Sequence, residues 1–282
     1  MSSDVRTAAG VLPRPAARAF HWVSAGREIL VLLGLFLGYK LGRMLTLFDP
    51  HLAFTNAHRV WGLERALHLP RELGAQHALL GEPGAIGFAN GYYMFVHLPA
   101  TAACLIWVYA RAPGIYPALR AGLLGMTGLA LVLHLTFPLA PPRMLGELGF
   151  VDTGAVYGPS VYGPPEASGM LNQYAAMPSM HVGWAVLVAA AMVASSTSRW
   201  RWLFVAHPAI TTVAVVGSAN HYWLDGIVAC ALLGASLAVW RRHRAYEWDA
   251  MTRPQRGSAS SPAVAASGAT PSSRSSTCAQ RR

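Results

Sequence analysis

The chain has 282 residues, a formal net charge of +10, 54% hydrophobic residues and only 12% charged residues. Soluble domains carry about 25% charged residues, so this composition excludes a disordered protein and argues against an ordinary soluble domain. The three cysteines lie far apart, which suggests neither a disulfide framework nor a zinc site.

Six apolar windows are predicted to be transmembrane helices, because a hydrocarbon core of about 30 Å takes roughly 20 residues to cross. The first window contains Lys40 and Arg43, so we expect its outer end to be wet or to face protein. The fourth and fifth are short and weakly apolar. The sequence therefore predicts an all-α, polytopic, six-helix bundle, with spans at residues 29–47, 86–109, 121–140, 181–197, 202–219 and 222–240.

The placement of arginine predicts the orientation of these spans. Basic residues gather in residues 1–28, 110–120, 198–201 and 241–282, whereas the opposite side carries few. By the positive-inside rule both termini are cytoplasmic, and segments 48–85 and 141–180 face outward. A basic rim on the cytoplasmic leaflet accounts for the net charge without a nucleic acid partner.

The domain organisation follows from these spans. Residues 1–28 form a cytoplasmic segment and 29–242 the membrane domain, whereas the Ser-, Ala- and Pro-rich tail 243–282 is predicted to be disordered. Helical spacing in the outer segment 51–81 indicates helices on the membrane interface or packed over the bundle, or alternatively a lid over an outer site.

Outside Glu28, only one carboxylate, Asp225, lies in a predicted span, four residues after His221. On a helix these positions share a face, so Asp225 can hold one ring nitrogen of His221 and leave the other as a nucleophile or base. A structural His–Asp pair between helices is the alternative.

A second cluster, Pro178, Ser179 and His181, has the features of a helix start. The free N–H groups and positive dipole of a helix N-terminus suit a phosphate oxygen, and His181 would stand over the same anion. The alternative is an ordinary cap with an interfacial histidine.

The third cluster is Arg143, which follows two prolines just beyond the third span. Its planar guanidinium matches phosphate, although an arginine at this position can also be a snorkelling anchor. All three clusters fall at the outer ends of predicted spans. Together they would supply the cation, the anion site with an acid, and the activated histidine of one phosphoryl-transfer site.

The motifs PPRM, MPSMH and NHYWLD resemble the three signature motifs of the type-2 phosphatidic acid phosphatase superfamily, and more narrowly its inositol phosphorylceramide synthase (inositolphosphotransferase) branch. The resemblance covers about residues 28–242. It implies a six-helix membrane bundle and metal-independent phosphoryl transfer from a lipid-linked phosphate. By motif position, His221 resembles the nucleophile, Asp225 its orienting carboxylate and His181 the acid, whereas Arg143 and Ser179 resemble phosphate ligands.

Three positions depart from the family pattern. A lysine is usual where this chain has Thr136, a glycine where it has Met180, and an arginine where it has Val215. The inositolphosphotransferase branch shares such losses of cations. Three residues are candidates to replace them: Lys40, Arg43 and Asn220.

The sequence thus predicts a metal-independent enzyme of the cytoplasmic membrane that needs no cofactor. Its partners are a lipid phosphate and the bilayer, with no obligate protein partner evident. A transporter or scaffold that kept the fold and lost activity is the alternative. His97 and His134 are expected to be core histidines. Asn90, Tyr92 and Tyr93 indicate an aromatic belt, or alternatively a contact to the substrate headgroup.

Overall fold

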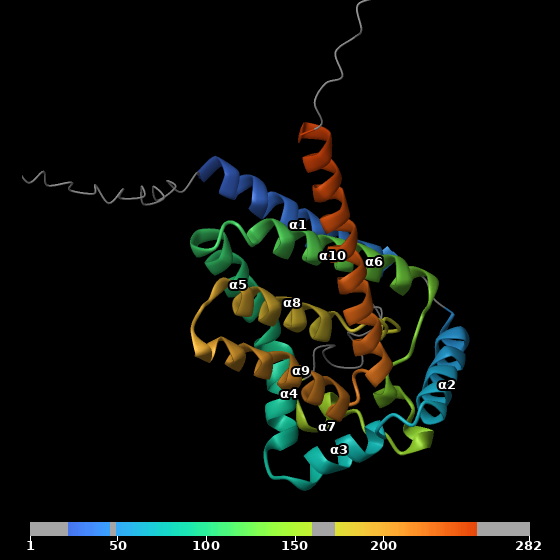
Figure 1. Cartoon of the computed structure of the whole chain (residues 1–282). Coiled ribbons are helices and arrows are strands. Elements are labelled where there is room, and N and C mark those ends of the chain that lie inside the picture. Colours follow the sequence, from blue (N-terminus) through green and yellow to red (C-terminus); the bar gives the residue numbers. More distant parts are fainter. Residues whose placement is uncertain (1–21, 46–48, 160–172, 253–282) are drawn as a thin grey trace, which may run out of the picture. The chain divides into compact units, whose positions relative to one another are not determined.

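The computed structural model describes residues 22–45, 49–159 and 173–252, so the tail from residue 253 and part of the outer loop 141–180 lie outside the described residues. The chain divides into two compact units, residues 1–243 and 244–282, and the candidate site belongs to the first. The described part is helical, and its one β pairing is an isolated bridge between Leu139 and Ala175. Its long helices are α1 (Trp22–Leu45), α2 (Pro50–Ala66), α3 (Glu72–Gly81), α4 (Ala85–Phe95), α5 (His97–Arg111), α6 (Tyr116–Thr136), α8 (Met180–Ser195), α9 (Ala206–Gly217) and α10 (Trp223–Thr252) (Figure 1).

Each predicted span corresponds to helical structure, although two of the spans are broken. The span at 86–109 is formed by α4 and α5, which meet at a bend of 45°. The span at 202–219 begins as a 3-10 helix, η4 (Arg199–Val205), and only then becomes α9. Pro208 stands near the start of α9, where a missing N–H is tolerated.

Two helices are long and apolar enough to cross a membrane alone, Tyr116–Thr136 and Trp223–Glu247, and the bent pair α4 and α5 makes up to three among the described residues. The chain is therefore a membrane protein by its apolar helices. The count of six stays a prediction, because α8 and α9 are short and α1 carries charged residues at both ends.

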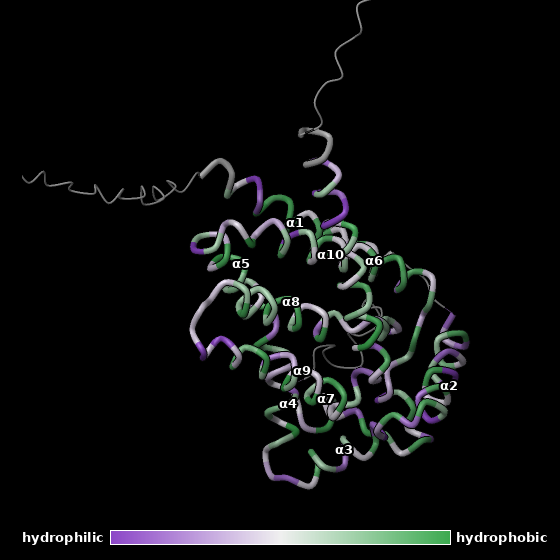
Figure 2. Tube along the Cα trace, viewed as in Figure 1, coloured by the Kyte–Doolittle hydropathy of each residue, from purple (hydrophilic) through white to green (hydrophobic). Residues whose placement is uncertain are grey.

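Helix α8 lies at the centre of the packing and contacts α5, α6 and α9, whereas α1 lies along α6. Hydrophobic residues dominate α5, α6 and α8 (Figure 2). Gly183 allows the close approach of α6 to α8, because a Cβ at this position would lie 2.5 Å from the Met126 side chain. This packing holds the first turn of α8, which carries His181, in a fixed position.

Helix α2 is packed over the segment that precedes Arg143. Its buried face includes Ala53, Ala57 and Val60, and the Asn56 amide donates to the Pro138 carbonyl at 2.9 Å. The structure therefore packs this helix against the rest of the protein, which is one of the arrangements that we expected for segment 51–81.

Helix α10 extends to Thr252, ten residues beyond the boundary at 242 that the sequence indicated. Arg and Ala residues in this stretch are good helix formers, and Arg244 pairs with Glu247 three residues on at 3.4 Å. Loss of hydrophobicity marked the end of a span but not the end of the helix.

Candidate active site

Backbone hydrogen bonds join the three motif segments to one another. The N–H of Arg143 donates to the Ala219 carbonyl at 2.8 Å, and the N–H of Ser179 donates to the Asp225 carbonyl at 3.0 Å. The first and second segments are joined by the bridge between Leu139 and Ala175. Residues more than 80 positions apart in the chain are thereby held at one place.

The hydrogen bonds of His221 determine its tautomer. Nδ1 lies 2.9 Å from the Ala176 carbonyl oxygen and 3.1 Å from Oδ2 of Asp225. A carbonyl oxygen can only accept, so Nδ1 carries the proton. In the neutral ring the lone pair is therefore on Nε2, which makes no hydrogen bond among the described residues and is placed to act as a nucleophile or a base.

Asp225 is completely buried directly behind His221. Its Oδ2 also accepts the N–H of Tyr222 at 2.8 Å, whereas Oδ1 has no hydrogen-bond partner among the described residues. The carboxylate is thus fixed by the first turn of its own helix, α10. It can stabilise positive charge on the His221 ring, because burial in a low dielectric strengthens that interaction.

His181 lies in the first turn of α8. Ser179 is the N-cap of this helix, and its hydroxyl accepts the N–H of Val182 at 3.4 Å. The His181 ring packs between Tyr93 and His97, with ring centroids at 4.2 and 4.4 Å. Its centroid lies 6.1 Å from that of His221. The two candidate catalytic rings therefore face a common space.

That space is a small polar cavity of about 40 Å³. His181, His221 and Asn220 form part of its wall, together with Tyr39, Tyr93, His134, Pro141, Gln173, Ala175, Ala176, Pro178 and Met180. Asp225, Ser179 and Arg143 lie outside this wall. Ser179 is buried as a helix cap. The structure thus brings the two histidines to the cavity wall and places Asp225, Ser179 and Arg143 behind that wall.

Arg143 is buried, with 3% of its side chain exposed, and its guanidinium is held on three sides. Nε donates to Oδ1 of Asn220 at 3.1 Å, one terminal nitrogen to Oε1 of Gln173 at 3.1 Å, and the other to Oδ2 of Asp152 at 3.3 Å. A snorkelling anchor would instead extend to the membrane surface. Arg143 orients Asn220 and Gln173, both of which line the cavity.

Three residues beside the cavity were not assigned a catalytic place from the sequence. Tyr93 and His97 enclose the His181 ring, and His134 lines the cavity while its Nε2 lies 3.4 Å from the Pro178 carbonyl. Each is a polar group within a predicted span, and such residues generally mark functional positions. The sequence alone could not distinguish them from histidines and tyrosines that form hydrogen bonds within the protein core, because it does not show which helices lie side by side. Asn90 has a structural place, because it donates to the Thr153 and Gly158 carbonyls.

The departures from the family pattern also have definite positions. Thr136 is exposed and its hydroxyl turns back to the Val132 carbonyl, whereas Val215 is fully buried. Neither supplies charge to the cavity. Lys40 lies over the Phe36 ring, 5.8 Å from its centroid, and the side chain of Arg43 lies outside the described residues. Of the two candidate replacements whose side chains are described, Lys40 and Asn220, Asn220 lines the cavity.

A family model described as the PAP2 superfamily matches residues 58–239. This chain belongs to the PAP2 superfamily. The match includes all five candidate site residues and begins after α1. Membership indicates phosphatase-like activity on phosphate esters. Searches of curated proteins and of solved structures returned no match. Within the described residues, no group of three or more His, Cys, Asp or Glu side chains is arranged to hold a metal ion.

Proposed function

We propose that this protein is a membrane phosphatase or phosphotransferase that acts on a lipid-linked phosphate through a phosphohistidine at His221. The tautomer of His221 carries the proposal. Since Ala176 and Asp225 both accept from Nδ1, the lone pair of Nε2 is available beside a cavity that His181 shares. PAP2 membership supplies the chemistry of phosphate ester cleavage.

In the first step, Nε2 of His221 attacks phosphorus and the bond from phosphorus to the leaving alcohol oxygen breaks. His181, protonated at the start, donates its proton to that oxygen, while Asp225 stabilises the positive ring of the phosphorylated His221. In the second step, His181 takes a proton from the acceptor hydroxyl, and the acceptor oxygen displaces His221 from phosphorus. Water as acceptor gives hydrolysis, and an alcohol gives transfer.

The contacts of the motif arginine support a role for it at the site. Arg143 donates to Asn220, which lines the cavity, and the N-terminus of α8 adds its backbone dipole. Substitution of the family lysine and arginine by Thr136 and Val215 lowers the positive charge at the site. A phosphodiester or a lipid-linked monoanion suits such a site better than a strongly charged phosphate, which favours the inositolphosphotransferase-like branch.

The proposed location is the outer face of the cytoplasmic membrane, with both termini in the cytoplasm. The orientation rests on the arginine distribution. The membrane location itself is supported by the apolar helices.

Trapping the covalent intermediate tests this proposal. Purified protein is incubated with a lipid phosphate carrying ³²P, quenched and analysed for protein-bound label. We expect label that is acid-labile and base-stable in wild type and absent in His221→Ala. Label on His181 would exchange the two roles, and absence of label together with phosphate release would indicate direct attack by water. Neither release nor transfer from a panel of lipid phosphates would favour the transporter or scaffold. Activity is expected to persist in excess EDTA.

A further inference from the structure

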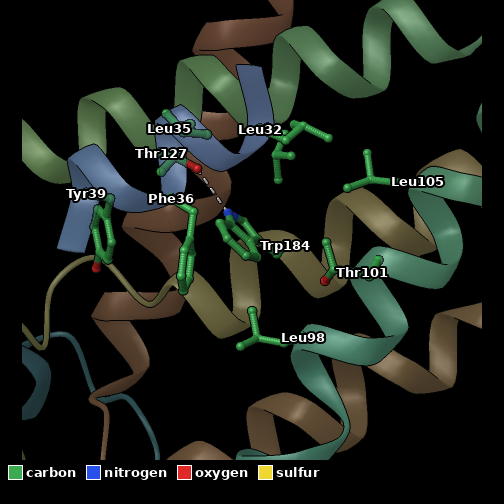
Figure 3. Close-up of a pocket in the computed structure, with 11 residues that line it drawn as sticks. Leu32, Leu35, Phe36, Tyr39, Leu98, Thr101, Leu105, Thr127 and Trp184 are labelled. Carbon is green, nitrogen blue, oxygen red and sulfur yellow. Dashed lines mark hydrogen bonds between the residues drawn. The ribbon is translucent and has the colours of Figure 1, made fainter. Parts of the chain in front are cut away.

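An apolar pocket lies directly beside the polar cavity, and the two share the side chain of Tyr39. The apolar pocket has a volume of about 160 Å³ and is bounded by α1, α5, α6 and α8 (Figure 3). Trp184 forms one wall, one turn along α8 from His181. The ring of His97 stacks on Trp184 and packs at a tilt against His181, at 5.3 and 4.4 Å between centroids.

The polar atoms of this pocket are already satisfied. The Trp184 indole N–H donates to the Thr127 hydroxyl at 3.2 Å, the dashed line in Figure 3, and the Thr101 hydroxyl donates to the His97 carbonyl at 2.9 Å. The remaining wall is hydrocarbon and aromatic surface, with Leu32, Leu35, Phe36, Leu98 and Leu105. The indole N–H and the Thr101 hydroxyl proton are used within the protein, and most of the wall is hydrocarbon and aromatic surface, so the pocket suits a hydrocarbon chain better than a polar ligand.

A second apolar pocket of about 120 Å³ continues the first, since Leu32 and Leu105 line both. Its far end is closed by Glu28 and Tyr116, and Arg120 pairs with Glu28 there. The half-buried residues of α1 along this path, Ala25, Glu28, Leu32, Leu35 and Tyr39, recur every three or four positions. They form a single stripe that contacts α6 at both ends, through Tyr39 with His134 and Glu28 with Arg120, and that lines the groove formed by the two pockets together with residues of α5.

The length of this groove fits one hydrocarbon chain. Glu28 and Tyr39 are eleven residues apart on α1, which corresponds to roughly 17 Å at about 1.5 Å per residue. One leaflet occupies about half of the ~30 Å hydrocarbon core, so the groove is about one leaflet long. It begins at the catalytic cavity and ends at a charged cluster. A lipid whose phosphate occupies the cavity could therefore place its hydrocarbon chain in this groove.

We propose that the groove between α1 and α5 binds an acyl chain of the phosphorylated substrate, and that α1 is the element that makes the enzyme select lipid. This inference rests on the proposed phosphoryl-transfer function and names the substrate class of that site. Because the family match begins at residue 58, α1 lies outside it, and the groove is formed partly by a helix outside the matched residues.

Two groove-filling variants, Leu32→Trp and Leu105→Trp, test the proposal on the full-length protein in detergent micelles. Each is assayed with a long-chain lipid phosphate and with p-nitrophenyl phosphate. We expect the ratio of kcat/KM for the long-chain substrate to that for the aryl phosphate to fall roughly tenfold or more, since loss of two buried methylene groups has that effect. The matched control is Leu33→Trp, on the exposed face of the same helix, which should keep the wild-type ratio. An unchanged ratio in both groove variants, or an equal fall in the control, overturns the proposal.

A second measurement separates failure of the groove from failure of the enzyme function. A phosphatidic acid with a diazirine on its acyl chain is photolysed with the wild-type protein, and the adducts are mapped by mass spectrometry. We expect adducts on Leu32, Leu35 and Leu105. Adducts distributed equally over the exposed Leu33 and Leu37 would mean bulk lipid and overturn the proposal, whether or not the protein releases phosphate. Adducts in the groove with no turnover would instead refute the proposed enzymatic function.

Discussion

The carboxylate of Glu64 accepts the backbone N–H of Leu224 at 2.7 Å and so joins the outer helix α2 to the start of α10. Leu224 precedes Asp225, so this bond fixes the turn that carries the carboxylate behind His221. Glu64 is completely buried, and its Oε2 has no hydrogen-bond partner among the described residues. Burial, together with the neighbouring Glu72 carboxyl group, raises the pKa of Glu64 to about 9.

This raised pKa predicts a pH-dependent stability. Between the ordinary value of 4.5 and about 9, the folded protein keeps a proton on Glu64 that the unfolded chain has released. Stability must therefore fall as pH rises through this window. Glu64→Gln keeps both an acceptor for Leu224 and a donor toward Glu72, so the wild type should lose thermal stability relative to this variant between about pH 5 and pH 9. The other charged groups facing Glu64, namely Arg65, Glu72 and Asp225, remain in both proteins.

Thermal unfolding in detergent at several pH values measures the difference. Glu64→Ala should be less stable than Glu64→Gln at every pH by about 1–3 kcal/mol, because the Leu224 N–H loses its acceptor. Glu82, an exposed glutamate at the end of α3, is the control, and Glu82→Gln should follow the wild-type profile. Parallel profiles for the wild type and Glu64→Gln would contradict the assignment.

Asp225→Asn should lower turnover by roughly 10²–10⁴-fold, in line with orienting carboxylates elsewhere. The amide can present its NH₂ group to Nδ1 of His221 and favour the other tautomer, and it removes the charge that stabilises the phosphorylated ring. Steady-state rates and the yield of trapped label measure the effect. Asp49→Asn is the matched control, because Asp49 is an exposed N-cap of α2 and asparagine caps equally well. If turnover of Asp225→Asn fell by less than a few-fold, the contact between His221 and Asp225 would have a structural role only.

His181 and His221 should respond differently to the leaving group. His181→Ala is expected to impair substrates with a poor leaving alcohol most, and p-nitrophenyl phosphate much less, because a good leaving group needs no protonation. His221→Ala should abolish both reactions, since no covalent intermediate forms. The rates of both variants on alkyl and aryl esters provide the test. Equal losses in His181→Ala on the two substrates would argue against its role as the acid.

Arg143→Ala should lower turnover on the order of 10²-fold or more, because Asn220 and Gln173 lose the charged group that orients them beside the cavity. Arg143→Lys should also be impaired, since an ammonium group cannot hold Asn220, Gln173 and Asp152 at once. Arg59→Ala, an exposed position on α2, is the control. Full activity of the lysine variant would mean that only the position of the charge matters.

Cysteine labelling should report the orientation of the membrane domain. Val156 and Gly114 are both exposed, so Val156→Cys and Gly114→Cys can be introduced singly into a chain whose native cysteines are replaced. A membrane-impermeant maleimide should label the cysteine at 156 in intact cells and the cysteine at 114 only after permeabilisation. The opposite pattern would place the candidate site in the cytoplasm.

Periodicity and motif spacing predicted the helical elements well where the signal is local. Apolar runs located α5, α6, α8 and α10, because a bilayer demands about 20 apolar residues whatever lies beside them. The bend between α4 and α5 and the 3-10 start of α9 were not predicted, since both depend on how neighbouring helices pack. The helical extension to Thr252 was missed because hydropathy reports burial in lipid and not helix propensity.

The candidate site divides in the same way. The sequence by itself determined the residue types at the ends of the predicted spans and the spacing of four between His221 and Asp225. The expected common helix was wrong for His221, which lies just before α10 (Trp223–Thr252), whereas Asp225 lies in its first turn. Only the tertiary structure decided which ring nitrogen is free, because the Ala176 carbonyl that fixes the tautomer lies 45 residues away. It also decided that Tyr93, His97 and His134 adjoin the cavity, that Arg143 acts through Asn220 and Gln173, and that α1 and α5 leave a groove between them. Such contacts join distant segments, and no local pattern encodes which distant atoms will meet.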